Sequence, residues 1–206
     1  VISNVQMERM ASAAGPTGGK IVCPASNEAP AKVAFGQCSG SRDVNHLNYC
    51  SGICCLASLK QATYVKEQLP DAEVTMYYID RRAPGRNEDF LLKVAEIEGV
   101  NLVKGKVGRI EEQNGKIKLH VEDVENVKII EVEPDLVVLA TGMVPNAADD
   151  DLAIFTRKDD EGFVLDDLDS GVTVAGVASR PEDVAASVRD ATGAAARAVI
   201  AAGGRA

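Results

Sequence analysis

The segment Lys32–Gln68, which reads KVAFGQCSGSRDVNHLNYCSGICCLASLKQATYVKEQ, decides the fold. Its opening residues KVAFGQ are a short apolar run of the kind found in buried strands. Apolar residues at helical spacing follow over Ile53–Gln68, and Pro70 stops this helix. AEVTMYYID at Ala72–Asp80 is a second strand. Strand–helix–strand alternation predicts a parallel sheet with right-handed crossovers.

The same alternation continues to Glu133. A short helix is expected over Phe90–Ile97, followed by a short strand at VNLVKG. VGRIEEQNGKIKLHVE then predicts a hairpin, because its Asn114-Gly115 pair is a strong turn signal. VKIIEVE adds one more strand. We therefore predict an α/β fold in which a Rossmann-like unit carries a β meander.

The two flanks differ from each other in pattern. Val1–Pro30 is rich in Gly, Pro and Ala and is expected to be a loop with one short strand at Lys20–Val22. Near the other end, LVVL at Leu136–Leu139 and GVTVAGVA at Gly171–Ala178 are expected as buried strands. A long helix should follow Pro181. Its expected apolar face consists of Val184, Val188, Ala191, Ala195 and Val199.

Composition excludes several classes of protein. The chain has 206 residues and is 46% hydrophobic, so it can bury a core. Its net charge of -9 and its few aromatic residues argue against a nucleic-acid partner. It contains no apolar run of 18 residues, so we expect no membrane span and a cytoplasmic location.

Four of the five cysteines gather within a short stretch: Cys38, Cys50, Cys54 and Cys55. Their spacing matches neither the usual zinc pairs nor the bacterial ferredoxin run. Three interpretations stay open. The thiols hold a [4Fe–4S] cluster against the helix N-terminus, or a zinc ion that stabilises an interaction module, or they are free or redox-active, in which case Cys54 and Cys55 are the dithiol of a thiol–disulfide oxidoreductase of the pyridine nucleotide–disulfide type. Cys23 lies outside this group.

The residues around the cysteines give weaker signals. His46 is expected to be a surface histidine of the loop. Arg42 and Asp43 either pair with each other or leave Arg42 to donate hydrogen bonds to cluster sulfurs. The first strand is followed by CSGSRD rather than by a glycine-rich turn, so NAD(P)H binding is not expected here.

The stretch QCSGSRDVNHLNYCSGICCLASLKQATYV resembles the cluster segment of the heterodisulfide reductase A-type flavoproteins. Within these it is most similar to the A-type component of the quinone-interacting membrane-bound oxidoreductase of sulfate reducers. LVVLATGMVPN and the closing GVTVAGVASRPEDVAASVRDATGAAARA are similar to the flavin-domain segments of that family. The resemblance covers nearly the whole chain.

The resemblance implies two cofactors, FAD and a [4Fe–4S] cluster, in an electron-transfer oxidoreductase subunit. The cluster ligands correspond to Cys38, Cys50, Cys54 and Cys55, and no side chain is implied to be catalytic. The residues implied to approach FAD are Thr141, Gly142, Gly176, Pro181, Asp183 and Val184.

The family has a thioredoxin-reductase-like core, in which an inserted NAD-domain-like unit splits a flavin domain. It implies that residues 1–31 are a linker or part of the flavin domain, that 32–133 are the NAD-domain-like unit, and that 134–206 are the C-terminal part of the FAD-binding domain. The family's GxGxxG turn does not occur in this sequence. We therefore expect a C-terminal fragment with an incomplete FAD site, inactive alone and prone to self-association.

The implied partners are the other subunits of a membrane-associated redox complex, with adenylylsulfate reductase among them. They would hold the chain at the periphery of the membrane.

Overall fold

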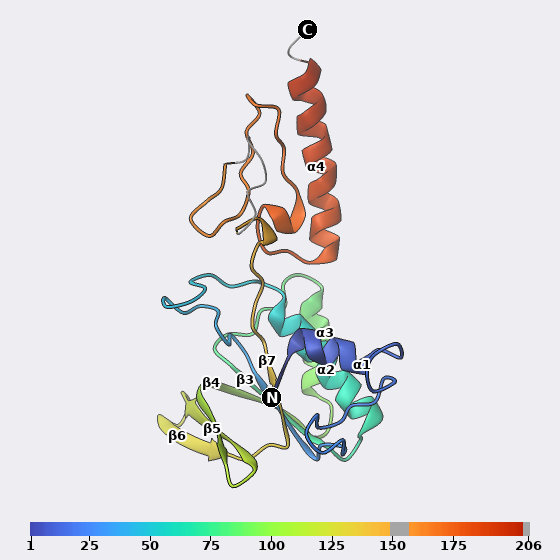
Figure 1. The fold of residues 1–206 in the computed structure, drawn as a ribbon, viewed down its shortest axis with the longest axis vertical. Helices are drawn as coiled ribbons and strands as arrows, with labels where there is room; N and C mark the ends of the chain where they lie inside the picture. The colour runs from blue at the N-terminus through green and yellow to red at the C-terminus, as the bar shows by residue number, and fades with distance from the viewer. Residues whose placement is uncertain (149–156, 204–206) are drawn as a thin grey trace. The chain divides into compact units, whose positions relative to one another are not determined.

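The structure is a computed structural model that describes residues 1–148 and 157–203. The chain forms two compact units (Figure 1). The first consists of Val1–Cys50 and Cys54–Gly142, and the second of Ser51–Ile53 together with the chain from Met143 onward. The resemblance implied that residues 1–31 are a linker or part of the flavin domain and that 134–142 belong to the FAD-binding domain. Both stretches contribute to the same compact unit as residues 54–133.

The first unit is built on a seven-stranded sheet with the order β1-β7-β2-β3-β4-β5-β6. Strands β1, β7, β2, β3 and the first part of β4 are parallel, and β4, β5 and β6 form an antiparallel meander. The strands are β1 (Ile2–Ser3), β2 (Lys32–Gly36), β3 (Glu73–Tyr78), β4 (Val100–Gln113), β5 (Lys116–Asp123), β6 (Lys128–Val132) and β7 (Leu136–Leu139). The predicted α/β class, with its parallel sheet and meander, is confirmed.

One long strand joins the parallel sheet to the meander. VNLVKG and the first arm of the hairpin, which the sequence separated, are both part of β4. Its residues Val100–Lys104 pair with β3, those from Gly105 onward pair with β5, and a register shift lies between Val107 and Arg109 within the second pairing. The predicted turn at Asn114-Gly115 is present, and both of its residues have positive φ.

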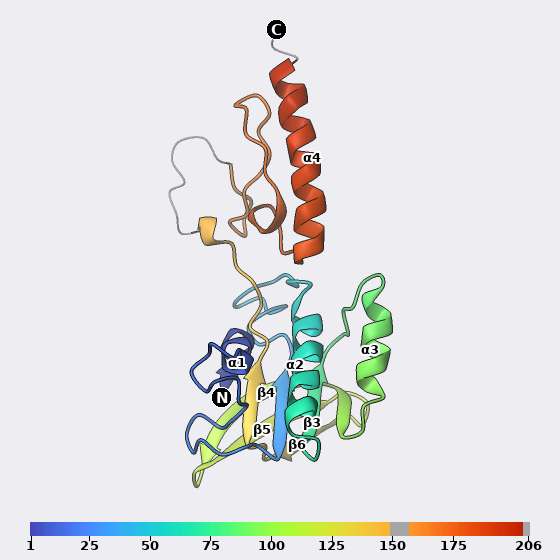
Figure 2. The same cartoon turned by 90° about the vertical axis from the view of Figure 1, so that its right-hand side faces the viewer.

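Three helices cover one face of the parallel sheet, and the meander covers the other (Figure 2). These helices are α1 (Asn4–Ala11), α2 (Cys54–Gln68) and α3 (Asn87–Ala95). The core on the helix side centres on Phe35, which is fully buried with Leu59 and Val74. On the other side, Ala34 and Tyr77 pack against Leu119 and Val121 of the meander. Successive residues of β2 thus alternate between two cores, as a strand buried on both faces requires.

The helix α1 corrects the prediction that residues 1–30 are a loop. A capping box starts it: Ser3 Oγ accepts from the Gln6 N–H, and Gln6 Oε1 accepts from the Ser3 N–H. Met7 and Met10 bury its apolar face in the helix-side core. The predicted short strand at Lys20–Val22 is wrong, because these residues are outside any strand.

The second unit contains two short 3₁₀ segments, η1 (Asn146–Ala148) and η2 (Gly176–Ala178), and the long helix α4 (Val184–Gly203). The buried strand predicted over Gly171–Ala178 is wrong, since this segment has one isolated bridge, at Val172, and then η2. The helix after Pro181 is confirmed.

The predicted apolar face of α4 is exposed, and Val184 is 82% accessible. Polar groups instead join the helix to η2 and to the segment before it: Asp190 accepts a hydrogen bond from the Gly176 N–H at 2.8 Å, and the Arg197 guanidinium donates to the Val174 carbonyl at 3.0 Å.

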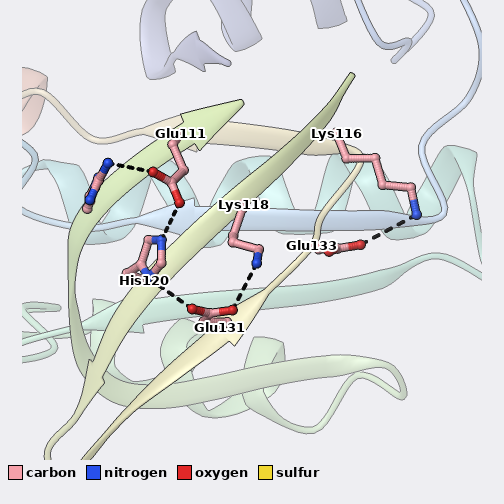
Figure 3. Close-up of polar contacts among 7 residues, drawn as sticks. Glu111, Lys116, Lys118, His120, Glu131 and Glu133 are labelled. Carbon is pink, nitrogen blue, oxygen red and sulfur yellow. Dashed lines mark hydrogen bonds and ion pairs between the residues drawn. The ribbon is translucent and has the colours of Figure 1, made fainter. Parts of the chain in front are cut away.

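A chain of polar and charged side chains links the strands of the meander (Figure 3). His120 on β5 lies 2.8 Å from Glu111 on β4 and 3.5 Å from Glu131 on β6, and Glu131 also pairs with Lys118 at 2.9 Å. Opposite charges on neighbouring strands stabilise their pairing.

The helices in the described part of the chain are too short or too polar to span a membrane.

Candidate functional site

The four clustered cysteines lie where parallel strands of the first unit end. Cys38 follows β2, the segment Asp80–Arg82 follows β3, and Thr141–Gly142 follows β7. A backbone hydrogen bond joins the turn after β2 to the turn after β7: the Ser39 N–H donates to the Ala140 carbonyl at 3.0 Å. The carboxyl edge of a parallel sheet is the usual position of ligand sites in α/β proteins.

The loop after β2 folds back on itself and returns the chain towards Cys38. Cys38 and Arg42 both have φ near +56°, a left-handed conformation that side chains other than glycine rarely adopt. The Arg42 N–H donates to the Tyr49 carbonyl at 3.2 Å, and the Leu47 N–H donates to the Gly40 carbonyl at 3.0 Å. Because the loop folds back in this way, Cys50 approaches Cys38 in space although eleven residues separate the two in the sequence.

The structure brings the four thiols into one site. Every pair among Cys38, Cys50, Cys54 and Cys55 is close enough for a charge on one sulfur to act on the other. The last two stand at the first turn of α2, where the helix dipole places partial positive charge. Loop and helix thus contribute two thiols each.

Hydrogen-bond donors point at three of these sulfurs. The Arg42 guanidinium donates to Cys38, the Gly142 N–H to Cys54 and the Arg82 N–H to Cys55. Each of these contacts lowers the pKa of its cysteine, because each favours the thiolate. Thiolate is the form in which cysteine binds metals.

Burial acts in the opposite direction and is the larger effect. It raises the pKa of Cys38 and of Cys55, and it raises the pKa of Cys54 to about 11. Negative charge on neighbouring sulfurs adds to this rise. A nucleophilic cysteine has a lowered pKa, so this environment is unlike that of a reactive dithiol.

Other residues near the cysteines are accounted for by the fold. Arg42 and Asp43 do not pair with each other, which corrects one expectation: Arg42 pairs with Asp80 at 2.7 Å, and Asp43 with Lys106 at 3.5 Å. Arg42 also contacts Cys38, as the alternative interpretation required. His46 is exposed on the loop.

Cys23 lies apart from the four. Its thiol is 3.6 Å from the Asp135 carbonyl, and the Asp135 carboxylate accepts from the N–H groups of Ala31 and Lys32 where β2 begins. It therefore lies at the amino end of β2, and it packs against the helix-side core.

The residues predicted to approach FAD are divided between the two units. Thr141 and Gly142 belong to the first unit, and Gly142 contacts Cys54. Gly176, Pro181, Asp183 and Val184 belong to the second. Gly176 has φ near +61°, and the Asp183 carboxylate accepts from the Ala186 N–H at 2.6 Å, which caps α4.

The thiols are not disposed like the ligands of a single ion. Across residues 1–148 and 157–203, no group of three or more His, Cys, Asp or Glu side chains is arranged to hold one metal ion. None of the five cysteines is in a disulfide. The donor set itself, four thiols with N–H groups directed at three of them, fits the four-cysteine ligation of a [4Fe–4S] cube.

The sequence did not reveal all of these contacts. Arg82 lies in a charged stretch, Arg81–Arg86, and its backbone N–H donates to Cys55. Every residue except proline has a backbone N–H, so residue type could not identify this donor, and the position of the segment after β3 was the only signal. Gln37, the residue before Cys38, also escaped notice, although its side chain is buried.

Comparison with known proteins places these features in a family context. No family model matches the chain. Over 97% of its length it is 39% identical to the A component of the H(2):CoB-CoM heterodisulfide,ferredoxin reductase of Methanothermobacter thermautotrophicus, of which it covers 32%. It is 35% identical over 95% of its length to the iron-sulfur A component of the CoB–CoM heterodisulfide reductase of Methanocaldococcus jannaschii, of which it also covers 32%. The chain thus spans about a third of the length of these relatives.

A solved structure resembles the fold alone. Lactococcus lactis thioredoxin reductase matches with a TM-score of 0.50 and 18% identity, over 82% of this chain and 52% of that one. This agrees with the predicted thioredoxin-reductase-like architecture.

Proposed function

Because this chain is a homologue of one third of the A component of heterodisulfide reductases, we propose that it is an electron-transfer segment of an oxidoreductase. In this proposal Cys38, Cys50, Cys54 and Cys55 hold a [4Fe–4S] cluster that exchanges electrons with FAD. The observation that carries it is the convergence of the four thiols at the carboxyl edge of the sheet, with donors already directed at their sulfurs.

The protein's part in this chemistry is to hold, orient and shield. When bound, the cluster would supply storage of single electrons. The turn after β2 and the first turn of α2 set the ligand positions, and the N–H groups of Gly142 and Arg82 offset negative charge on Cys54 and Cys55. Gly142 belongs to the Thr141–Gly142 turn proposed to approach FAD, so the two cofactors would share one backbone segment.

The wider assembly is proposed on the family alone. The relatives are named as subunits of heterodisulfide reductases, one of them as an iron-sulfur subunit. We infer partner subunits for this chain as well, either in a heterodisulfide-reductase-like complex or in the quinone-linked complex of sulfate reduction. In the second case adenylylsulfate reductase would be a partner.

Anaerobic reconstitution tests the cluster. The chain is incubated with ferrous iron and sulfide, desalted and analysed for both elements and by electron paramagnetic resonance after reduction. We expect about four irons and four sulfides per chain. Cys50→Ser should lose most of the iron, whereas Cys23→Ser, the matched control at the other edge of the sheet, should retain it.

Two results would contradict the proposal. Less than about one iron per wild-type chain would remove the cluster. One tightly bound zinc without sulfide would instead support the zinc interpretation.

A further inference from the structure

Gln37 is a buried side chain without hydrogen bonds. It is 3% exposed, and neither its amide nitrogen nor its amide oxygen has a partner among the described residues. A buried polar group that lacks its hydrogen bond destabilises the folded state, because it has lost its water without gaining a partner. Such groups are rare in folded proteins, and each points to a strained site or to a missing ligand.

The same fold satisfies another buried glutamine completely. Gln61 on α2 is also fully buried. Its amide oxygen accepts from Asn4 Nδ2 at 2.6 Å, and its nitrogen donates to the Asn4 carbonyl at 3.0 Å and to Glu8 Oε1 at 2.9 Å. The lack of hydrogen bonds to the Gln37 amide is therefore specific to its location and is not a general feature of packing in this protein.

That location is directly beneath the cysteine site. Gln37 directly follows β2, and it lies on the helix side of the sheet because Leu59, Met76 and Leu91 of the helix-side core line the same cavity. The cavity has a volume of about 10 Å³, and Cys55, Tyr78, Arg81 and Arg82 line it beside these apolar side chains; no hydrogen bond joins any of them to the Gln37 amide. This cavity is too small for an organic ligand, and its aliphatic members offer no partner to an amide.

The charge of a ligated cysteine indicates which group can accept a hydrogen bond from the Gln37 amide. Cys55 is the one proposed cluster ligand in the lining of this cavity. Its own thiol is 3.6 Å from the Asp80 carbonyl, a contact that needs the thiol proton and is lost in the thiolate. A ligated thiolate carries negative charge and accepts hydrogen bonds, and the Gln37 amide is a donor in the lining of the same cavity.

We propose that Gln37 is a positioning residue for the cluster, whose side-chain N–H donates to the ligated sulfur of Cys55 and raises the reduction potential. This inference rests on the proposed function. Reduction adds one electron and changes no bond, so the charge of the cluster and its ligands becomes more negative by one. A donor directed at the sulfur stabilises the more negative state, and the potential rises.

The test uses the reconstituted full chain and two glutamine-to-methionine variants. Methionine has nearly the length of glutamine and no amide, so Gln37→Met removes the proposed donor with little change of volume. Gln61→Met removes an amide that has a structural role only and is the matched control. Gln37→Leu is the second variant, for use if Gln37→Met does not fold.

The readouts are the midpoint potential, from a redox titration followed by electron paramagnetic resonance, and the urea midpoint of the cluster-free chain. For Gln37→Met we expect wild-type iron content, a potential lowered by the equivalent of about tenfold in the reduction equilibrium, or about 59 mV for one electron, and an unchanged or higher urea midpoint. For Gln61→Met we expect the reverse: an unchanged potential and a lower urea midpoint.

An unchanged potential in Gln37→Met would overturn the inference while leaving the cluster itself established. A urea midpoint lowered as far as in Gln61→Met would also overturn it, because the amide would then have a structural partner such as a buried water. If the wild-type chain binds no iron, the proposed function fails first, and the iron analysis reports this separately from the potential.

Discussion

Gln61→Met should destabilise the first unit strongly, although it leaves the volume of the side chain nearly unchanged. Gln61 joins α1 to α2 through its three hydrogen bonds with Asn4 and Glu8. Each such bond contributes about 1 kcal/mol net, so their loss costs roughly 3 kcal/mol. Greater burial of apolar surface by methionine offsets part of this, and we expect a net loss of about 2 kcal/mol.

Urea unfolding followed by far-ultraviolet circular dichroism measures this loss, because the chain has no tryptophan to serve as a fluorescent probe. With a urea dependence of about 2 kcal/mol per molar, the midpoint should fall by roughly 1 M. The double variant Asn4→Ala/Gln61→Met should lose less than the sum of the two single changes, since the two residues share their bonds. An unchanged midpoint in Gln61→Met would show that the network between α1 and α2 contributes nothing to stability.

Three further changes probe other parts of the structure. Phe35→Ala should lower the free energy of unfolding by about 3–5 kcal/mol, because it empties the centre of the helix-side core; a loss below about 1 kcal/mol in urea unfolding would contradict this packing. Lys118→Gln removes the partner that lowers the pKa of Glu131, whose stabilisation is complete above the unfolded pKa of about 4.3 and is lost as pH falls through the lower folded pKa. The variant should therefore be less stable than the wild type at pH 7 and should match it near pH 3 in urea midpoints; a difference that persists in acid would refute the pairing. Gly176→Ala should cost about 1–2 kcal/mol, because φ is near +61° and a new Cβ would meet Ser187 Cβ at 3.0 Å; faster amide exchange in α4 would report it, and unchanged exchange would contradict it.

The sequence predicted the parallel sheet well because its strands are continuous apolar runs, and a strand buried on both faces needs such a run. It failed where structure depends on local polar contacts. The helix α1 was hidden in a segment rich in Gly and Ala, although Ser3 and Gln6 carry the spacing of a capping box. The valines of α4 led to the opposite error: they were predicted to form an apolar face but are exposed, because hydrogen bonds of Asp190 and Arg197 hold that helix in place.

The cysteine site was predictable in its residue types and not in its geometry. Spacing alone left the cluster, zinc and free thiols open, since the convergence of Cys38 with Cys50 depends on the left-handed residues of the intervening loop. The donors from Gly142 and Arg82 are backbone groups that any residue would supply. Gln37 was invisible for another reason: an unsatisfied amide can be recognised only when its surroundings are known.

The position of the site explains why a thiol cluster suits this edge of the sheet. In dinucleotide-binding units the turns after parallel strands, and the helix that follows, direct N–H groups at phosphate oxygens. Here the N–H groups of Gly142 and Arg82 face the sulfurs of Cys54 and Cys55 instead. The requirement is the same in both cases, because a buried anion needs donors fixed in place before it binds. By this reasoning the amide of Gln37, which lies under the same helix without a partner, completes a donor shell whose acceptor is the negatively charged ligand at Cys55.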